Sequence, residues 1–259
     1  MARDRKDALA AAELPDIVRR IRARTPARLL AGRAGAAYRT QTQLELREAH
    51  AAARDAVRDE LDLRKALGAE FVERWKILEL RTRARSKEEY LLRPDLGRQF
   101  DDASRSELPR RAAPHPDLQI AIGDGLSVAA VAAQVPELLP LLAAGAQKRG
   151  WKLGSVFAIR HCRVGIVNEI GDLLHTRVVV LLVGERPGLA TAESLSAYMA
   201  YRPCAVHTDA NRSLISNIHA RGLSPADAAD RILALAAKMM AARISGVALR
   251  EDAPALERK

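Results

Sequence analysis

The segment Arg177-Val-Val-Val-Leu-Leu-Val-Gly-Glu-Arg-Pro-Gly-Leu189 decides the fold. Six apolar residues follow Arg177, four of them valines, before Gly184 ends the run. An apolar run without alternation is typical of a strand that is buried on both faces of a parallel sheet. Two glycines and Pro187 then predict a stiff, tight turn at the carboxyl end of this strand.

Candidate strands and helices alternate along the second half of the chain. The strands span residues 118–122, 154–160 and 177–183, and the helices span the later part of 164–175 and residues 224–243. Gly123-Asp-Gly125 predicts a tight turn from the first strand into an apolar helical pattern. Such alternation predicts the α/β class, with a mostly parallel, Rossmann-like sheet over residues 113–259.

The first half has a different pattern. Short amphipathic segments at 16–24 and 41–58 predict helices, and only residues 75–80 resemble a short strand. Three prolines between Pro109 and Pro116 break any helix, so we place a domain boundary there. The apolar stripes are narrow, and marginal helices depend on packing. We therefore expect residues 1–112 to form a smaller all-helical domain that docks on another surface, such as a partner subunit.

The composition limits the class of protein. The 259 residues are 48% apolar but only 3% aromatic, and their net charge is +10. The first 112 residues carry 26 Lys and Arg against 19 Asp and Glu. Two cysteines exclude a disulfide scaffold. No apolar segment is expected to reach the roughly 18 residues of a membrane span, so we expect a cytoplasmic protein without a membrane partner.

Motifs for self-sufficient catalysis are missing from the sequence. It has no P-loop, no dinucleotide-binding fingerprint and no nucleophile elbow. Its six histidines lack the spacing of metal ligands, so we expect no metal site of its own and no catalytic residue. The loops at Gly123 and Gly184 remain as candidate ligand sites, where Glu185 offers a carboxylate acceptor, although both also fit plain turns. These features favour a binding or structural subunit.

Several ordered segments resemble one known family, that of the small (light) subunit of ethanolamine ammonia-lyase. The segments are Thr25-Pro-Ala-Arg-Leu-Leu-Ala-Gly-Arg-Ala-Gly35, Ala49-His-Ala-Ala-Ala-Arg-Asp-Ala-Val57, Tyr90-Leu-Leu-Arg-Pro-Asp-Leu-Gly97, Asp124-Gly-Leu-Ser127, Glu185-Arg-Pro-Gly-Leu189, Ser194-Leu-Ser-Ala-Tyr198 and Ile215-Ser-Asn-Ile218. They occur in the family's order and cover about residues 16–250.

The resemblance implies a role in an adenosylcobalamin-dependent lyase that converts ethanolamine to acetaldehyde and ammonia. In this family a large TIM-barrel subunit holds the substrate, and the small subunit contributes to the cobalamin site at the interface, in an assembly of six large and six small chains. The small chain is not expected to be active alone. The resemblance also implies a base-on cofactor, and the absence of the D-x-H-x-x-G motif, which supplies a cobalt-ligating histidine, is consistent with this. The location implied is the cytoplasm, with a bacterial microcompartment as an alternative.

Three positions of the family contact cobalamin, and the resemblance carries them to Val164, Glu185 and Leu214. Glu185 is expected to accept hydrogen bonds from the corrin's peripheral amides. Val164 and Leu214 are expected to cover apolar corrin edge. Family members commonly carry cysteine where this chain has Leu214, so the contact expected here is one of packing.

Two alternatives remain open from the residues alone. The basic charge also fits a nucleic-acid-binding protein, although the aromatic residues that stack on bases are scarce. The glycine loops also fit a stand-alone α/β enzyme, which would be active as a single chain.

Overall fold

The computed structural model describes residues 16–25, 29 and 31–249. Its centre is a six-stranded sheet in the spatial order β3-β5-β4-β6-β7-β8. The strands are β3 (Leu78–Arg81), β4 (Leu118–Gly123), β5 (Phe157–Arg160), β6 (Val178–Gly184), β7 (Leu195–Tyr201) and β8 (Ser213–Ile218). The first four strands in this order are parallel. Strand β7 pairs antiparallel with β6, and β8 pairs antiparallel with β7. The predicted mostly parallel α/β sheet is confirmed.

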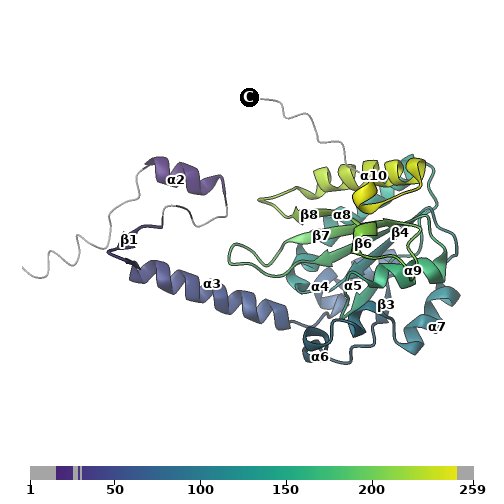
Figure 1. The fold of residues 1–259 in the computed structure, drawn as a ribbon, viewed down its shortest axis with the longest axis horizontal. Helices are drawn as coiled ribbons and strands as arrows, with labels where there is room; N and C mark the ends of the chain where they lie inside the picture. The colour runs from purple at the N-terminus through teal and green to yellow at the C-terminus, as the bar shows by residue number, and fades with distance from the viewer. Residues whose placement is uncertain (1–15, 26–28, 30, 250–259) are drawn as a thin grey trace, which may run out of the picture.

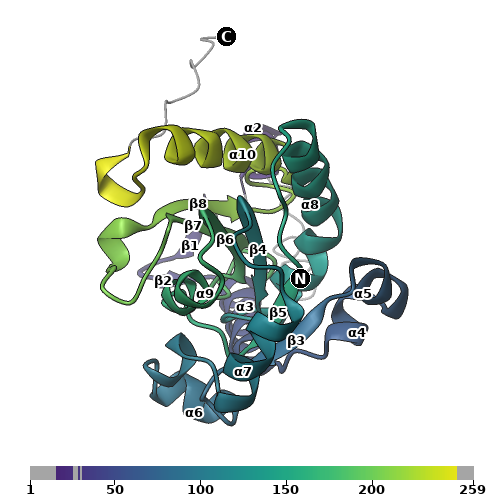
Figure 2. The same ribbon diagram turned by 90° about the vertical axis from the view of Figure 1, so that its right-hand side faces the viewer.

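The central strands β4 and β6 are buried along their whole length because helices cover both faces of the sheet. Alternate residues of β6 point into two separate cores, with Val180 in one and Leu181 in the other. The first core is closed by α4 (Leu63–Leu67), α5 (Ala69–Trp75), α8 (Val128–Lys148) and α10 (Pro225–Ala242). The second is closed by α7 (Asp102–Arg111) and α9 (Ile166–Leu174). Figure 1 and Figure 2 show these layers.

The crossovers reverse direction at β4. From β4 the chain passes through α8 to β5 on one side, and then through α9 to β6 on the other side of β4. Right-handed crossovers in opposite directions place their helices on opposite faces, as α8 and α9 are. The crevice at such a switch point, beyond the carboxyl ends of the strands, is where doubly wound sheets bind ligands. The strand order differs from that of nucleotide-binding Rossmann domains.

The expectation of an all-helical N-terminal part is wrong. The strand foreseen at 75–80 forms as β3, and it pairs with β5 as an edge of the main sheet. A short hairpin of β1 (Arg33–Ala34) and β2 (Ala37–Tyr38) adds further strand. Hydrophobic residues of α4 and α5 share a core with the sheet. The division of the chain at residue 112 stays a prediction.

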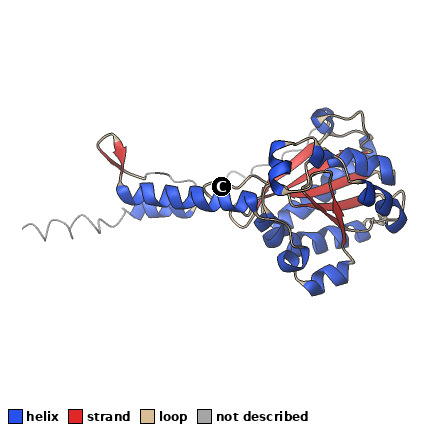
Figure 3. Ribbon diagram, turned by 90° about the horizontal axis from the view of Figure 1, so that it is seen from below, coloured by secondary structure: helices blue, strands red, loops and turns tan. Residues whose placement is uncertain are grey.

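The remaining N-terminal helices lie away from the sheet. These are α2 (Asp16–Ala23) and the long helix α3 (Thr40–Arg58), and Figure 1 and Figure 3 show α3 leading outward from the body. Thr42 is the only buried residue of α3. Part of the Thr25–Gly35 motif lies outside the described residues. Because α3 covers little of its own chain, it is free to contact another one.

Helix α8 corrects the expectation about long apolar segments. Its 21 residues contain an 18-residue window with a mean hydropathy of 1.6, which is long and apolar enough to cross a membrane by length and composition alone. However, α8 packs against α10 and β6, and residues such as Leu138 and Leu142 lie in the core. This packing is that of the core helix of a globular protein.

Short helices connect the main elements of the fold. Ser86 caps α6 (Lys87–Leu92), because its hydroxyl accepts a hydrogen bond from the Glu89 backbone amide at 3.2 Å. The 3-10 helix η1 (Leu96–Arg98) follows α6 and packs on the start of α9. Two more 3-10 helices, η2 (Asp209–Asn211) and η3 (Gly246–Ala248), flank β8 and α10.

Candidate functional site

The loops after β4, β5 and β6 meet at the carboxyl edge of the sheet and line a hollow of about 430 Å³, here called the Glu185 hollow. Val164, Glu185 and Leu214, separated by 50 residues in sequence, all line it. The other lining residues are Tyr90, Gly125, Leu126, Cys162, Arg163, Val183, Gly184, Arg186, Ser196, Tyr198 and Ser216. The structure therefore brings the three predicted residues together, and their part in cofactor binding stays a prediction.

A buried carboxylate fixes the floor of this hollow. Asp124, fully buried after β4, accepts hydrogen bonds from the backbone amides of His161 (2.9 Å) and Cys162 (2.8 Å). The buried ammonium group of Lys87 lies 3.7 Å from Asp124 and donates to the Gly125 carbonyl at 3.0 Å. These contacts tie α6 to the loops after β4 and β5, so the hollow has a rigid base.

Cys162 is the one thiol in this lining, and it is not poised as a nucleophile. Burial raises the pKa of the Cys162 thiol well above its ordinary value, and the negative charge of Asp124 raises it further. Because the thiolate is the reactive form, this cysteine stays protonated and inert at neutral pH. The hollow therefore offers binding contacts rather than covalent chemistry.

Arg163 and Tyr90 form the wall beside Val164. The Tyr90 hydroxyl donates to the Cys162 carbonyl at 3.1 Å, while Arg163 Nη2 donates to the Tyr90 carbonyl at 3.1 Å. The Arg163 guanidinium lies 4.1 Å from the centroid of the Tyr90 ring. Burial raises the pKa of Tyr90, as does the negative charge of Asp124, so its hydroxyl remains a donor. Arg163 Nε is buried and has no hydrogen-bond partner within the described structure.

The Glu185 carboxylate is more heavily engaged than the sequence predicts. It accepts hydrogen bonds from Ser194 Oγ (2.7 Å), Ser196 Oγ (2.5 Å) and the backbone amide of Asn217 (3.0 Å). A carboxylate has about four acceptor sites, so only about one remains for an external donor. Glu185 therefore holds β7 and β8 against the loop after β6.

Leu214 and Val164 supply the apolar part of the hollow. Leu214 lies on β8 opposite Tyr198 of β7, and 46% of Leu214 is exposed. Val164 is half-buried and packs against the second core, as does Tyr198. Burial raises the pKa of Tyr198, and the charge of Glu185 raises it further, so the phenol is neutral here. An exposed leucine beside a neutral ring offers a flat apolar contact.

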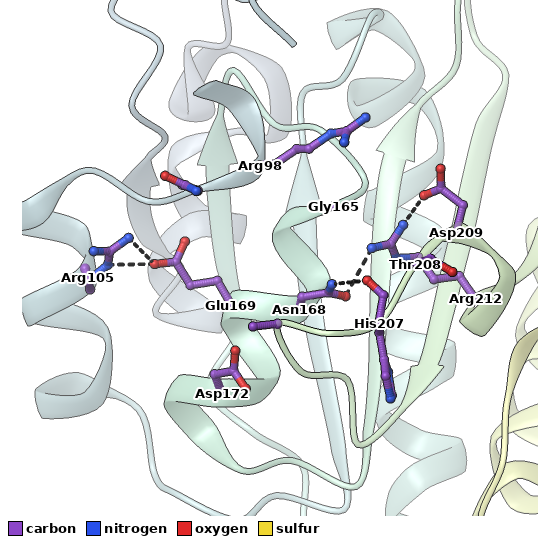
Figure 4. Close-up of a pocket in the computed structure, with 12 residues that line it drawn as sticks. Arg98, Arg105, Gly165, Asn168, Glu169, Asp172, His207, Thr208, Asp209 and Arg212 are labelled. Carbon is purple, nitrogen blue, oxygen red and sulfur yellow. Dashed lines mark hydrogen bonds and ion pairs between the residues drawn. The ribbon is translucent and has the colours of Figure 1, made fainter. Parts of the chain in front are cut away.

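A second hollow, of about 540 Å³, opens beside the first and is here called the α9 hollow (Figure 4). The two adjoin at the start of α9, because Val164 lines one and Gly165 the other. The residues of the α9 hollow are Arg98, Gln99, Arg105, Gly165, Asn168, Glu169, Asp172, Ala205, His207, Thr208, Asp209 and Arg212. Sequence reasoning missed this hollow because its polar residues are scattered and form no motif.

Ion pairs and amide contacts organise the α9 hollow. Arg105 pairs with Glu169 at 2.6 Å, and Arg212 pairs with Asp209 and donates to Asn168 Oδ1 at 3.1 Å. Asn168 Nδ2 in turn donates to the His207 carbonyl at 2.7 Å. Figure 4 shows these contacts as dashed lines.

Among the residues that the structure describes, no group of three or more His, Cys, Asp or Glu side chains is arranged to hold a metal ion.

Comparisons with known proteins find similarity to one family. A family model described as the ethanolamine ammonia-lyase light chain matches residues 15–250. The chain is 40% identical over 230 residues to an ethanolamine ammonia-lyase small subunit from Clostridium perfringens, covering 89% of this chain and 76% of that one. It is 37% identical over 230 residues to one from Clostridium acetobutylicum, covering 89% and 93%. A third, from Listeria monocytogenes, is 40% identical over 226 residues, covering 87% and 75%.

Proposed function

The chain belongs to the ethanolamine ammonia-lyase light-chain family, and from this premise we propose that it is the small subunit of an adenosylcobalamin-dependent lyase that converts ethanolamine to acetaldehyde and ammonia. One observation carries the proposal. Val164, Glu185 and Leu214, the positions that the family resemblance links to cobalamin, converge on one hollow at the carboxyl edge of the sheet. That edge is also the ligand-binding edge of a doubly wound sheet.

The residues of the hollow fit a corrin cofactor. Val164, Tyr198 and Leu214 give apolar contact. The buried Nε of Arg163, which has no hydrogen-bond partner among the described residues, is a donor for an oxygen of the cofactor. Cobalamin is larger than the drug-sized ligands that hollows of this volume enclose. We therefore assign this chain one wall of the site and a partner chain the other.

The chemistry that the cofactor supplies when bound is radical formation by cleavage of its cobalt–carbon bond. This chain's residues bind and orient. Glu185 holds β7 and β8 in place, so that Leu214 and Tyr198 keep their positions, and its remaining acceptor site takes one peripheral amide. The floor built on Asp124 keeps Val164 and Arg163 rigid, because their backbone follows directly from the amides it binds. No catalytic role is assigned to a residue of this chain.

The partner we propose is the large subunit, a TIM barrel, in an assembly of six large and six small chains. Small subunit is the printed name of the relatives, and a small subunit requires a larger one. Helix α3 supports a docking role, because it lies away from the sheet and exposes Leu44. Its residues His50, Ala53 and Val57 border a hollow of about 280 Å³ shared with Arg186 and Pro187, next to Glu185. A partner seated on α3 would thus also reach the cofactor site.

Co-expression with the large subunit tests the proposal. The purified complex is expected to release acetaldehyde from ethanolamine only when adenosylcobalamin is added, and this chain alone is expected to release none. The complex without cofactor and the large subunit alone are the controls. A stable complex that binds cofactor but releases no acetaldehyde would contradict the proposed reaction.

A further inference from the structure

Three arginines surround the start of α9, where the Glu185 hollow and the α9 hollow adjoin. They are Arg98 of η1, Arg163 before the helix and Arg212 before β8. No carboxylate lies within ion-pair distance of Arg98 or Arg163 among the residues whose structure is described, and Arg212 has Asp209, which is 89% exposed. Two of these three guanidinium groups, those of Arg98 and Arg163, therefore lack an acidic partner among the described residues. This end of α9 also carries the positive pole of the helix dipole.

Two glycines hold two of these arginines in place. A Cβ at Gly165 would come within 2.9 Å of Arg98 Cγ and Cδ, so the stem of Arg98 lies directly on the start of α9. A Cβ at Gly97 would come within 2.6 Å of Arg163 Cγ. The stems of both arginines are thus positioned by packing on glycines, and the Arg163 guanidinium is held further by the Tyr90 carbonyl and ring. Arginines fixed in this way are preorganised for a ligand.

Arg212 gives an independent indication of a missing acceptor. Its side chain is only 6% exposed, and its Nε is buried without a hydrogen-bond partner in the described structure. Burial lowers the pKa of Arg212, against the opposing effect of Asp209, and the positive charge of Arg98 lowers it as well. A buried N–H without a partner, beside a second cation, is costly unless an anion binds there.

The acidic residues of the α9 hollow do not fill this role. In Figure 4, Arg98 lies over Gly165 on the side of Arg212, whereas Glu169 and Asp172 lie farther along α9. Glu169 is already occupied, because it pairs with Arg105 at 2.6 Å and accepts from the Phe100 amide at 2.7 Å.

We propose that Arg98, Arg163 and Arg212 form a site for a phosphate-type oxyanion and that, in the assembled enzyme, this group is the phosphodiester of cobalamin bound in the adjoining Glu185 hollow. The assignment of the source rests on the proposed function. Arginine suits this ligand, because its guanidinium group presents several N–H donors to phosphate oxygens in matching geometry. The seam at Val164 and Gly165 lets one large ligand reach both hollows.

The affinities for two corrinoids distinguish the contribution of this site from that of the rest of the cofactor pocket. Cyanocobalamin carries the phosphodiester, whereas cobinamide lacks the nucleotide and its phosphate. Their dissociation constants are measured on the co-purified complex of this chain with the large subunit. Arg98→Gln is expected to weaken cyanocobalamin binding about tenfold and to leave cobinamide binding within about twofold. Arg98→Lys, which keeps the charge, should recover part of the loss.

Arg93→Gln is the matched control. Arg93 is exposed on the same connection between α6 and α7, lines neither hollow and pairs with the exposed Asp95 at 2.7 Å. Surface pairs of this kind contribute little, so both corrinoids should bind this variant as they bind the wild type. Equal losses for both corrinoids in Arg98→Gln, or no loss for either, would overturn the phosphodiester assignment.

A second arm identifies the source of the oxyanion. Inorganic phosphate is titrated into the complex without corrinoid. One outcome would overturn cobalamin as the source: Arg98→Gln abolishes phosphate binding but changes the affinities for the two corrinoids equally. The oxyanion would then be a free phosphate ester. If neither corrinoid binds the wild-type complex, the proposed function fails, and phosphate binding then decides the site alone. Absence of phosphate binding in that case overturns the oxyanion site as well.

Discussion

Glu185 shows how one side chain serves both structure and binding. Its carboxylate accepts from the hydroxyl of Ser194, just before β7, from the hydroxyl of Ser196 on β7 and from the backbone amide of Asn217 on β8. Only a residue with several acceptor sites can make these bonds at once. The residue that the resemblance marks as a cofactor contact is therefore also the residue that positions Leu214 and Tyr198 on the neighbouring strands.

Replacing Glu185 with alanine should weaken cobalamin binding without preventing assembly. The change leaves the Asn217 amide and the two serine hydroxyls without their acceptor, at a cost of about 1–3 kcal/mol in the free energy of unfolding. Glu185→Gln keeps one acceptor oxygen and should lose less. The matched control is Glu193→Ala, an exposed residue of the same β6–β7 connection that lines neither hollow. Cobalamin titration of the complex measures the effect, and unchanged affinity in Glu185→Ala would refute this role.

At the scale of elements, the turns after β4 and β6 touch each other directly. A Cβ at Gly184 would collide with the carbonyl oxygen of Ser127, and Gly125 has a φ of +56°, which favours glycine. The Leu126 amide donates to the Gly184 carbonyl at 3.0 Å. The hollow therefore depends on two backbones that approach more closely than any side chain permits.

Gly184→Ala should destabilise the fold by about 1–3 kcal/mol, because the added methyl group pushes the two turns apart. Gly188→Ala is its control. It lies in the same loop, and the nearest atom to its added Cβ, the Thr191 carbonyl oxygen, is 4.0 Å away. That variant should change stability by no more than about 0.5 kcal/mol. Denaturant unfolding of the two variants measures this difference in stability, and equal stability of the two would contradict the close approach of the turns.

The amino ends of the central strands, opposite the two hollows, are linked by Asp117, which precedes β4. Its carboxylate accepts from the Lys152 amide (2.9 Å) and from Arg177 (2.8 Å), so it links the starts of β4, β5 and β6. Burial alone would raise the pKa of Asp117. The hydrogen bonds from Lys152 and Arg177 outweigh burial and lower the pKa below its ordinary value.

A lowered folded-state pKa gives a defined pH dependence. The stabilisation by Asp117 is fully present above its unfolded pKa of about 3.9 and is lost as the pH falls through the lower folded value. Asp117→Asn should therefore be less stable than the wild type by about 1 kcal/mol at pH 7. The difference should shrink below about pH 4. Unfolding measured from pH 7 to pH 2 provides the comparison, and a constant difference across that range would contradict it.

For the whole molecule, some features could be predicted from the sequence and others could not. The run from Val178 to Val183 predicts a strand buried on both faces, because no alternation is needed when helices cover both sides. Strand β7 gives no such signal, since serine and tyrosine interrupt its apolar residues. The turn glycines indicate the loop of Glu185, but not the partners of its carboxylate.

The positions of the three arginines could not be predicted at all. Arg98 and Arg212 are more than one hundred residues apart in sequence, and they approach only because η1 packs on α9 while β8 extends the sheet. The excess of arginine in the first 112 residues likewise says nothing about which of them face a ligand. Tertiary packing, and not local pattern, selects Arg98 from among them.

The most direct test of the central claim is the affinity of cobalamin for the large subunit alone and for its complex with this chain. If this chain forms one wall of the cofactor site, the complex should bind cyanocobalamin at least about tenfold more tightly, and Glu185→Ala should remove much of that gain. Equal affinity of the large subunit with and without this chain would contradict the account.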